Sequence, residues 1–223
     1  MKRRRLILII VAALLLGGLA FYLSRPKEPS YQDKTLTEWL RKLDKEIRPL
    51  PVVDPNAPEL ADSVKAIRSI GTNGIPTLLK LLNAKDFPAA TLAERVAQRI
   101  GCTPFQILHA EEKRELANWG FMVLGAQAHC AVPALIQFIK RAPADSKGWA
   151  ISCLSGVKPD KELLLPILTQ SMDDSDYHVA RVAATTIHIC YPEEAEKAGV
   201  YKMLPHLRRF NKDIVSTNVP IAK

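Results

Sequence analysis

The stretch Ile75-Pro-Thr-Leu-Leu-Lys-Leu-Leu82 decides the fold of this 223-residue chain, because its pattern recurs three more times. Proline suits the first turn of a helix, where its missing N–H would have had no partner, and the leucines after it fall at helical spacing. The other copies are Val132–Ile139, Leu165–Met172 and Leu204–Phe210. Each copy therefore predicts a short amphipathic helix that opens with proline.

An apolar helix is expected before each of these proline-led helices, and in three of the four cases it ends near a glycine. The expected first helices are Val64–Gly71, Phe121–Gly125, Ile151–Gly156 and Val179–Ile187. A single helical hairpin cannot bury its apolar faces alone, so neighbouring hairpins must stack on one another. The sequence thus predicts an all-α fold, an α-solenoid of stacked helical hairpins.

The alternation of Ala66-Ile-Arg-Ser-Ile-Gly71 with Ile75–Leu82 resembles HEAT repeats, particularly the short HEAT-like repeats of bacterial proteins. The segment Asp173–Ala184 resembles the Asp-x-x-x-Val-Arg-x-x-Ala turn and helix of that repeat, although its order Val-Ala-Arg departs from the pattern. The resemblance covers about residues 60–212. It implies a binding or scaffolding protein, and it does not by itself imply catalysis.

The anchoring prolines are separated by 57, 33 and 39 residues, so the first interval contains additional sequence. Two helical segments are expected there, one at about 89–100 and a second from Phe105, opened by Thr103-Pro104. We therefore expect an inserted hairpin at about residues 87–117.

Before the repeats, Thr35 and Glu38 have the spacing of a capping box, which predicts a helix from Thr35. Four prolines between Pro49 and Pro58 end that helix, because proline lacks the amide hydrogen that a helix needs. The expected boundaries are a linker at 24–34, this helix and its proline-rich loop at 35–58, the solenoid at 59–212 and a tail at 213–223.

At the N-terminus, the basic cluster Lys2–Arg5 is followed by an uncharged apolar run from Leu6 to Leu23. As a helix this run is about 27 Å long, close to the hydrocarbon thickness of a bilayer. Its length favours an uncleaved signal anchor at 1–23 over a cleaved signal peptide, for which Gly18-Leu-Ala20 offers a cleavage site. The cations before the run predict a cytoplasmic N-terminus and a body on the translocated side.

The formal net charge of +8 owes half of its value to this basic cluster. The remaining chain has 27 basic and 23 acidic residues, hence a net charge of +4, which does not require a nucleic-acid partner. We expect membrane contact through residues 6–23, no nucleic acid, and a protein partner whose identity the sequence leaves open.

Four cysteines lie in the body: Cys102, Cys130, Cys153 and Cys190. An even number permits two disulfides in an oxidising compartment. Their apolar neighbours, and the absence of a Cys-x-x-Cys spacing, favour small buried side chains within helices.

No motif in the chain predicts catalysis. His109-Ala-Glu111-Glu112 lacks the His-Glu-x-x-His spacing of a zinc site, and it fits the start of a solvated helix, where Glu111 and Glu112 meet the positive end of the helix dipole. We therefore expect a protein that is not an enzyme and that holds no cofactor and no metal. Two other hypotheses remain open: a lyase- or chaperone-like module that holds a small molecule in the solenoid groove, and a purely structural envelope component.

Positions counted from the anchoring prolines predict the partner-binding surface. The fourth residue after each proline is polar, and so is the seventh, whereas the residues one before and two after it are apolar. Second helices of stacked hairpins normally line the concave surface. We therefore expect a polar, mostly basic ladder facing the groove, formed by Lys80, Gln137, Lys140, Gln170 and Arg209.

The same polar residues also fit ordinary solvated positions on amphipathic helices. Apolar neighbours on these helices are expected in the core, namely Leu79, Leu82, Ile136 and Ile139. Three tryptophans are expected to pack in the core or between repeats: Trp39, Trp119 and Trp149.

Overall fold

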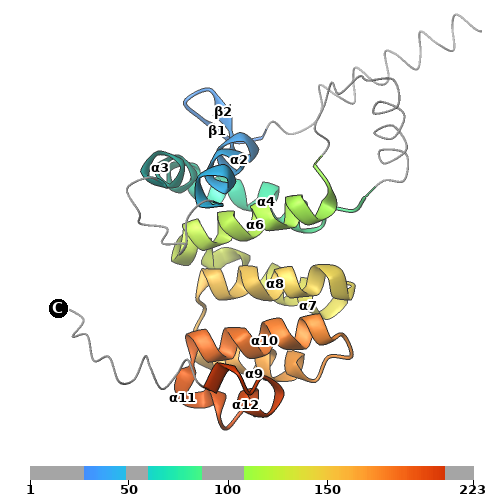
Figure 1. Ribbon diagram of the computed structural model, residues 1–223. Helices are drawn as coiled ribbons and strands as arrows, with labels where there is room; N and C mark the ends of the chain where they lie inside the picture. The colour runs from blue at the N-terminus through green and yellow to red at the C-terminus, as the bar shows by residue number, and fades with distance from the viewer. Residues whose placement is uncertain (1–27, 49–59, 87–107, 209–223) are drawn as a thin grey trace, which may run out of the picture.

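The structure is a computed structural model in which residues 28–48, 60–86 and 108–208 are described (Figure 1). The described chain is all-α, as predicted, apart from two two-residue strands, β1 (Ser30–Tyr31) and β2 (Lys34–Thr35). Its helices are α2 (Leu36–Ile47), α3 (Ala61–Ile70), α4 (Ile75–Leu82), α6 (Ala110–Leu124), α7 (Val132–Arg141), α8 (Ala144–Val157), α9 (Lys161–Met172), α10 (Tyr177–Cys190), α11 (Pro192–Ala195) and α12 (Val200–Met203). Two 3₁₀ segments, η2 (Gly71–Gly74) and η3 (Gly125–Ala131), lead into α4 and α7.

The predicted capping box at the start of α2 is confirmed. The Thr35 hydroxyl accepts the Glu38 N–H, and the Glu38 carboxylate accepts the Thr35 N–H at 2.7 Å. The expected linker at 24–34 is too long, because the Glu28 carboxylate accepts the Thr37 N–H and Trp39 Nε1 donates to the Tyr31 carbonyl at 2.9 Å. The folded part of the chain therefore includes the segment from residue 28.

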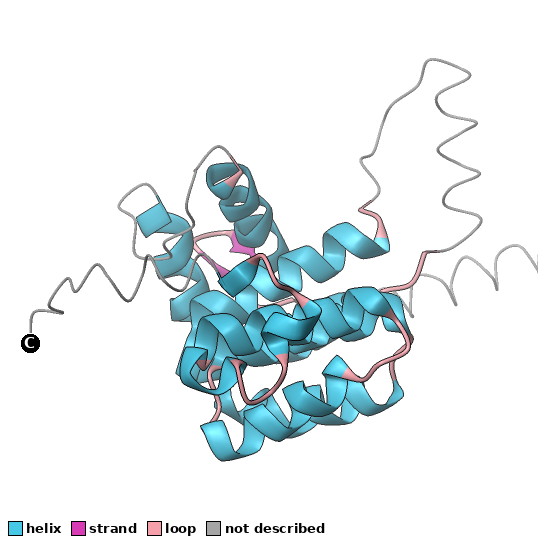
Figure 2. Cartoon of the chain, turned by 60° about the horizontal axis from the view of Figure 1, so that its bottom comes forward, coloured by secondary structure: helices cyan, strands magenta, loops and turns pink. Residues whose placement is uncertain are grey.

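The helices lie in two layers (Figures 1 and 2). Helices α6, α8 and α10 pack side by side in that order, and we call them the front layer. Helices α4, α7 and α9 form the second layer, and each packs extensively on the front-layer helix that follows it in sequence. This pairing differs from the expected hairpins, in which each proline-led helix would pair with the helix before it. The 3₁₀ segments η2 and η3 separate α3 from α4 and α6 from α7.

Glycines bring the front-layer helices close together. A Cβ added at Gly156 of α8 would lie 3.1 Å from the Cα of Met122 in α6, and one added at Gly148 would lie 3.2 Å from the His178 ring of α10. The sequence pattern predicted a helix that ends near Gly156, and this is confirmed. Helix α8 continues to Val157 and ends at Lys158, which adopts a left-handed conformation.

A single apolar core connects all the layers, from Leu36 in α2 to Leu204 after α12. Leu82 and Ile139 are buried in it as expected, whereas Leu79 and Ile136 are only partly buried and pack against its edge. Trp39 is buried, while Trp119 and Trp149 are partly buried against the same core. Each fully buried leucine contributes roughly 1.5–3 kcal/mol to folding, so this shared interior holds the stack together.

Three of the helices differ in their bounds from the sequence prediction. Helix α6 begins at Ala110 and runs without a break to Leu124, so residues 110–117 belong to it and not to an inserted hairpin. Pro166 lies inside α9, which begins one turn earlier at Lys161. Burial of the Leu164 side chain stabilises this turn before the proline. Pro205 lies in a turn after α12 and does not open the helix directly. The proposed segments at 89–100 and 103–105, the signal anchor and the tail lie outside the described residues.

Candidate partner-binding surface

Four of the five predicted ladder residues lie on the second layer, and all four are exposed. Lys80 is on α4, Gln137 and Lys140 are on α7, and Gln170 is on α9. Arg209 lies outside the described residues. The polar positions of the repeat pattern therefore reach solvent on all three second-layer helices.

The apolar positions of the same pattern hold these helices in place. The residues two after the prolines of α4, α7 and α9 have no exposed surface: Leu78, Leu135 and Leu168. Of the residues one before the prolines, Ile75, Val132 and Leu204 are buried, and Leu165 is partly buried against the core. Because large side chains fix one face of each helix, the polar face is presented in a defined orientation.

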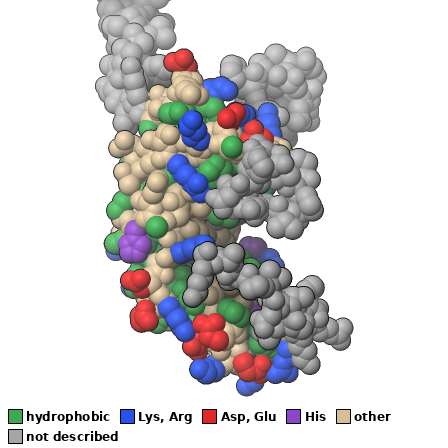
Figure 3. Space-filling view, turned by 90° about the vertical axis from the view of Figure 1, so that its left-hand side faces the viewer, with side chains coloured by type: hydrophobic (Ala, Val, Ile, Leu, Met, Phe, Trp, Pro, Cys, Tyr) green, Lys and Arg blue, Asp and Glu red, His purple; other side chains and the backbone are tan. Residues whose placement is uncertain are grey.

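That the second-layer helices line a groove stays a prediction, but the two layers differ in how closely their helices pack. Contacts between neighbouring helices are extensive within the front layer and sparse within the second layer, so the second-layer helices stand farther apart. A stack with one closely spaced layer and one widely spaced layer bends around the close one. Figure 3 shows that the described part of the molecule has a curved profile.

The exposed face of α4 and α7 is basic. Neither helix contains an acidic residue, and their exposed charged side chains are Lys80, Lys140 and Arg141. The 3₁₀ segments η2 and η3 contact each other, so the two helices begin side by side. All three cations lie in the last turn of a helix, where they also interact favourably with the helix dipole. Sequence reasoning missed Arg141, although its place beside Lys140 at a helix end was a usable signal.

Over the C-terminal helices, by contrast, acidic and basic side chains intermingle on the face shown in Figure 3. Lys161 Nζ lies 2.9 Å from a Glu194 carboxylate oxygen, and Arg208 Nη2 lies 2.7 Å from a Glu196 carboxylate oxygen. Among the ion pairs of the described residues, none involves Lys80, Lys140 or Arg141. The charges of α4 and α7 are thus not neutralised by the surrounding described surface.

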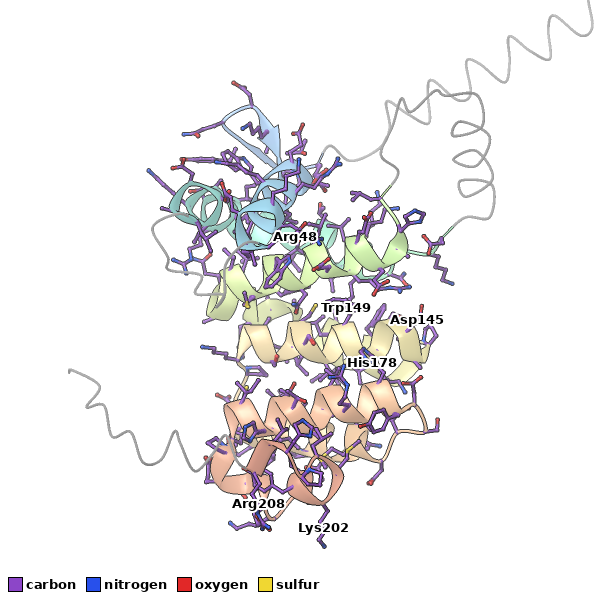
Figure 4. All side chains as sticks on the ribbon, viewed as in Figure 1. Arg48, Asp145, Trp149, His178, Lys202 and Arg208 are labelled. Atoms are coloured by element: carbon purple, nitrogen blue, oxygen red, sulfur yellow. The ribbon has the colours of Figure 1, made fainter. Side chains whose placement is uncertain are left out.

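Acidic side chains gather where α2 meets α6. Arg48 Nε donates to Asp44 Oδ2 at 2.9 Å, and Arg48 Nη2 lies 3.3 Å from Glu115 Oε2 (Figure 4). Burial raises the pKa of Glu115, and the neighbouring charge of Asp44 raises it further, while Arg48 acts in the opposite direction. This cluster joins the first helix of the body to the front layer.

Arg114 of α6 is the one buried cation among the described residues, with 8% of its surface exposed. Its Nη2 donates to the Ala84 carbonyl at 3.0 Å and lies 3.0 Å from Asp145 Oδ2 of α8. These contacts tie α6 to the end of α4 and to the start of α8. Helical periodicity gave no indication that this arginine would be buried.

A second charged contact fixes the turn between α9 and α10. Lys147 Nζ of α8 donates to Asp174 Oδ2 at 2.6 Å, and Asp174 Oδ1 accepts the Asp176 N–H at 3.0 Å. The Lys147 hydrogen bond is the largest cause of a lowered pKa at Asp174. Asp176 in turn caps α10, because its carboxylate accepts the His178 and Val179 N–H groups. The turn that resembles the HEAT pattern is therefore anchored to the front layer.

The histidines and cysteines have structural surroundings. His109 caps α6, with its N–H donating to Glu112 at 3.0 Å, which confirms the predicted helix start. His188 Nδ1 lies 3.3 Å from the Tyr201 hydroxyl. No group of three or more His, Cys, Asp or Glu side chains could hold a metal within the described part of the chain.

The expectation of buried cysteines holds only for Cys153, whose pKa is raised by burial. Cys130 and Cys190 are exposed: Cys130 lies in η3 between the buried Ala128 and Ala131, and Cys190 is the last residue of α10. All three are free thiols, and Cys102 lies outside the described residues.

A hollow of about 530 Å³ lies between the end of α9 and α12. Its lining consists of Thr169, Met172, Asp173, Ala198, Gly199, Lys202 and Met203. One carboxylate and one amine are the only titratable groups in this lining, and the hollow lies at the C-terminal end of the stack. It offers little of the convergent polar chemistry that a small-molecule site requires.

One stretch of the described residues, Ala110–Arg141, is long and apolar enough by composition to cross a membrane. It consists of α6, η3 and α7, and Gly125 with a φ of +50° separates the two helices. Its buried side chains, including Phe121 and Leu135, belong to the shared core. The predicted anchor at residues 6–23 lies outside the described part.

Comparison with known proteins returns no matching family model, no matching curated protein and no matching solved structure.

Proposed function

We propose that this protein is a membrane-anchored, HEAT-like α-solenoid that acts as a protein-interaction scaffold on the translocated side of the membrane. The observation that supports this most is the continuous core from Leu36 to Leu204, which holds successive helices in two layers with a regularly exposed polar face. Stacked helical repeats commonly use such extended faces for binding. The partner-binding surface in this proposal is the exposed second layer, with Lys80, Gln137, Lys140 and Gln170.

The proposed anchor limits where the body can lie. The apolar run ends at Leu23, and the folded part of the chain begins by Glu28, whose carboxylate is bonded to Thr37. The four residues between them span at most about 14 Å when fully extended. If the anchor is not cleaved, partners must therefore be reached close to the membrane surface.

Two measurements test this function. A C-terminal alkaline phosphatase fusion, which is active only after translocation, should be active, and membrane extraction should require detergent. Activity only of a cytoplasmic reporter, or release of the body into the soluble fraction after cleavage, would refute the topology or the anchor respectively.

Proximity labelling from the C-terminus should then identify recurrent neighbours of the full-length protein. We expect a double charge reversal, Lys80→Glu with Lys140→Glu, to remove at least one of them. The matched control is Lys45→Glu with Lys65→Glu, which makes the same charge change at exposed positions of α2 and α3. No recurrent neighbour for the wild type would contradict the scaffold function itself.

A further inference from the structure

We infer that the exposed face of α4 and α7 binds an acidic, extended segment of a partner protein. This inference rests on the proposed scaffold function and specifies the chemistry of its partner. The first reason is the charge of the face: Lys80, Lys140 and Arg141 are exposed, and α4 and α7 contain no carboxylate. An acidic ligand would complete ion pairs that the described surface does not provide, and complementary charge also accelerates encounter.

The second reason is the arrangement of the two helices. Because η2 and η3 are in contact, α4 and α7 start next to each other, and the cations of both helices lie in their last turns. The basic groups therefore lie toward one end of the second layer, on neighbouring helices. A chain that crosses both helices meets cations on each of them, whereas a compact anion would meet those of one helix.

The third reason favours a peptide over an anionic lipid surface. Uncharged amide side chains are exposed among the cations, namely Asn83 at the end of α4 and Gln137 on α7. A carboxamide both donates and accepts hydrogen bonds, so it can pair with the N–H and C=O groups of a peptide backbone. An extended peptide backbone offers a donor and an acceptor at each residue, whereas headgroup phosphates offer acceptors only.

The proposed binding face also ends at a defined place along the stack. Helix α9, the next member of the layer, contains Glu162 and is capped by Asp173, and its exposed Gln170 is uncharged. The basic character therefore stops after α7. A partner segment is expected to carry its carboxylates over α4 and α7 and to be neutral beyond them.

The test is fluorescence anisotropy with the full-length protein in detergent and two labelled peptides, one of alternating glutamate and serine and one with glutamine in place of glutamate. We expect the glutamate peptide to bind at low salt, at least tenfold more tightly than the glutamine peptide. Binding should weaken at least tenfold in the Lys80→Glu, Lys140→Glu variant and remain within twofold in the Lys45→Glu, Lys65→Glu control. Circular dichroism melts of both variants verify folding.

Four results would overturn the inference. Equal binding of the two peptides would remove the role of charge, and equal loss in both variants would show attraction to net charge alone. Phosphatidylglycerol vesicles that bind the body in a Lys80- and Lys140-dependent manner, while the glutamate peptide does not bind, would assign the face to lipid. Recurrent labelled neighbours that persist in the charge-reversed protein would refute the acidic partner while leaving the scaffold function intact.

Discussion

The two helix layers of this protein differ in the size of the side chains through which their helices pack. The front layer, α6, α8 and α10, is closely packed through glycine, so that Gly156 of α8 lies against the Met122 backbone of α6. The second layer, α4, α7 and α9, is fixed by large apolar side chains such as Leu135, and its helices stand farther apart. Small residues allow backbones to approach closely, as Gly156 does for α6 and α8, whereas the buried leucines fix the second-layer helices on the core.

The layers also differ in how their charges are used. In the front layer, charged side chains make contacts within the molecule, as Arg114 does with Asp145 and Lys147 with Asp174. In the second layer, Lys80 and Lys140 of α4 and α7 point to solvent. The comparison teaches that the front layer uses charge for cohesion, as Lys161 of α9 also does with Glu194, whereas the cations of α4 and α7 remain for a partner in our proposal.

The largest loss of stability is expected from truncating a buried leucine of the second layer. Leu135→Ala removes a side chain with no exposed surface, and we expect it to lower the free energy of unfolding by about 2–5 kcal/mol, because a cavity remains. The neighbouring Ile136→Ala is the matched control, since Ile136 is only partly buried, and its loss should be clearly smaller. Urea unfolding monitored by circular dichroism measures the free energy of unfolding of both variants. Equal losses of stability would contradict the assignment of Leu135 as the residue that fixes α7 on the core.

An intermediate effect is expected from a methyl group in the front layer. In Gly156→Ala the new Cβ meets backbone atoms of Met122 at 3.1 and 3.2 Å, so α6 and α8 must move apart. We expect a loss of about 1–3 kcal/mol from this overpacking, despite the gain of about 1 kcal/mol in helix propensity.

Gly148→Ala is the control for the same layer, because its Cβ meets side chains and no backbone: the ring of the exposed His178 at 3.2 Å, which can turn away, and Val182 Cγ2 at 3.8 Å. The stability of the Gly148→Ala variant should stay unchanged or rise slightly. If both substitutions are harmless in thermal melts, close glycine packing does not set the spacing of the front layer.

The smallest effects concern pH, and they should have opposite signs at two front-layer contacts. The pKa of Asp174 is lowered in the folded state, mainly by Lys147, so its contribution is full above the unfolded-state pKa near 4 and disappears as the pH falls through the folded-state pKa. The pKa of Glu115 is raised, mainly by burial, so its contribution is greatest at low pH and is lost as the pH rises through the folded-state pKa.

Asp174→Asn should therefore lower the free energy of unfolding more at pH 7 than at pH 3. Glu115→Gln should lower it less at pH 7 than at pH 3. Each change should stay below about 1 kcal/mol, because both contacts are partly solvated. Urea unfolding from pH 3 to 7 measures both variants. Parallel shifts of the two curves would show that these groups do not titrate differently in the folded and unfolded chains.

Prediction from sequence succeeded where the signal was local. The capping box of Thr35 and Glu38, and the proline-led starts of α4 and α7, depend on hydrogen bonds within one or two turns, so residue spacing was sufficient. It failed at Pro166, where burial of Leu164 extends the helix before the proline. It also failed for the exposure of Cys130, which depends on where the segment lies and not on its apolar neighbours.

For the candidate site, sequence periodicity placed Lys80, Gln137, Lys140 and Gln170 on exposed helix faces, since every helix must turn its polar side toward water. Periodicity along one helix does not say on which side of a curved stack those faces lie. Curvature follows from how closely neighbouring backbones approach, and that depends on which residues meet across two helices.

By itself, the sequence determined the all-α class, the helix caps and which face of each proline-led helix is buried, because these follow from hydrogen bonding and periodicity along one helix. Only the tertiary structure decided which helices pair, the role of Gly156 as a contact between helices, and the burial of Arg114. Each of those depends on a residue distant in sequence, whose position is set by the packing of the whole core.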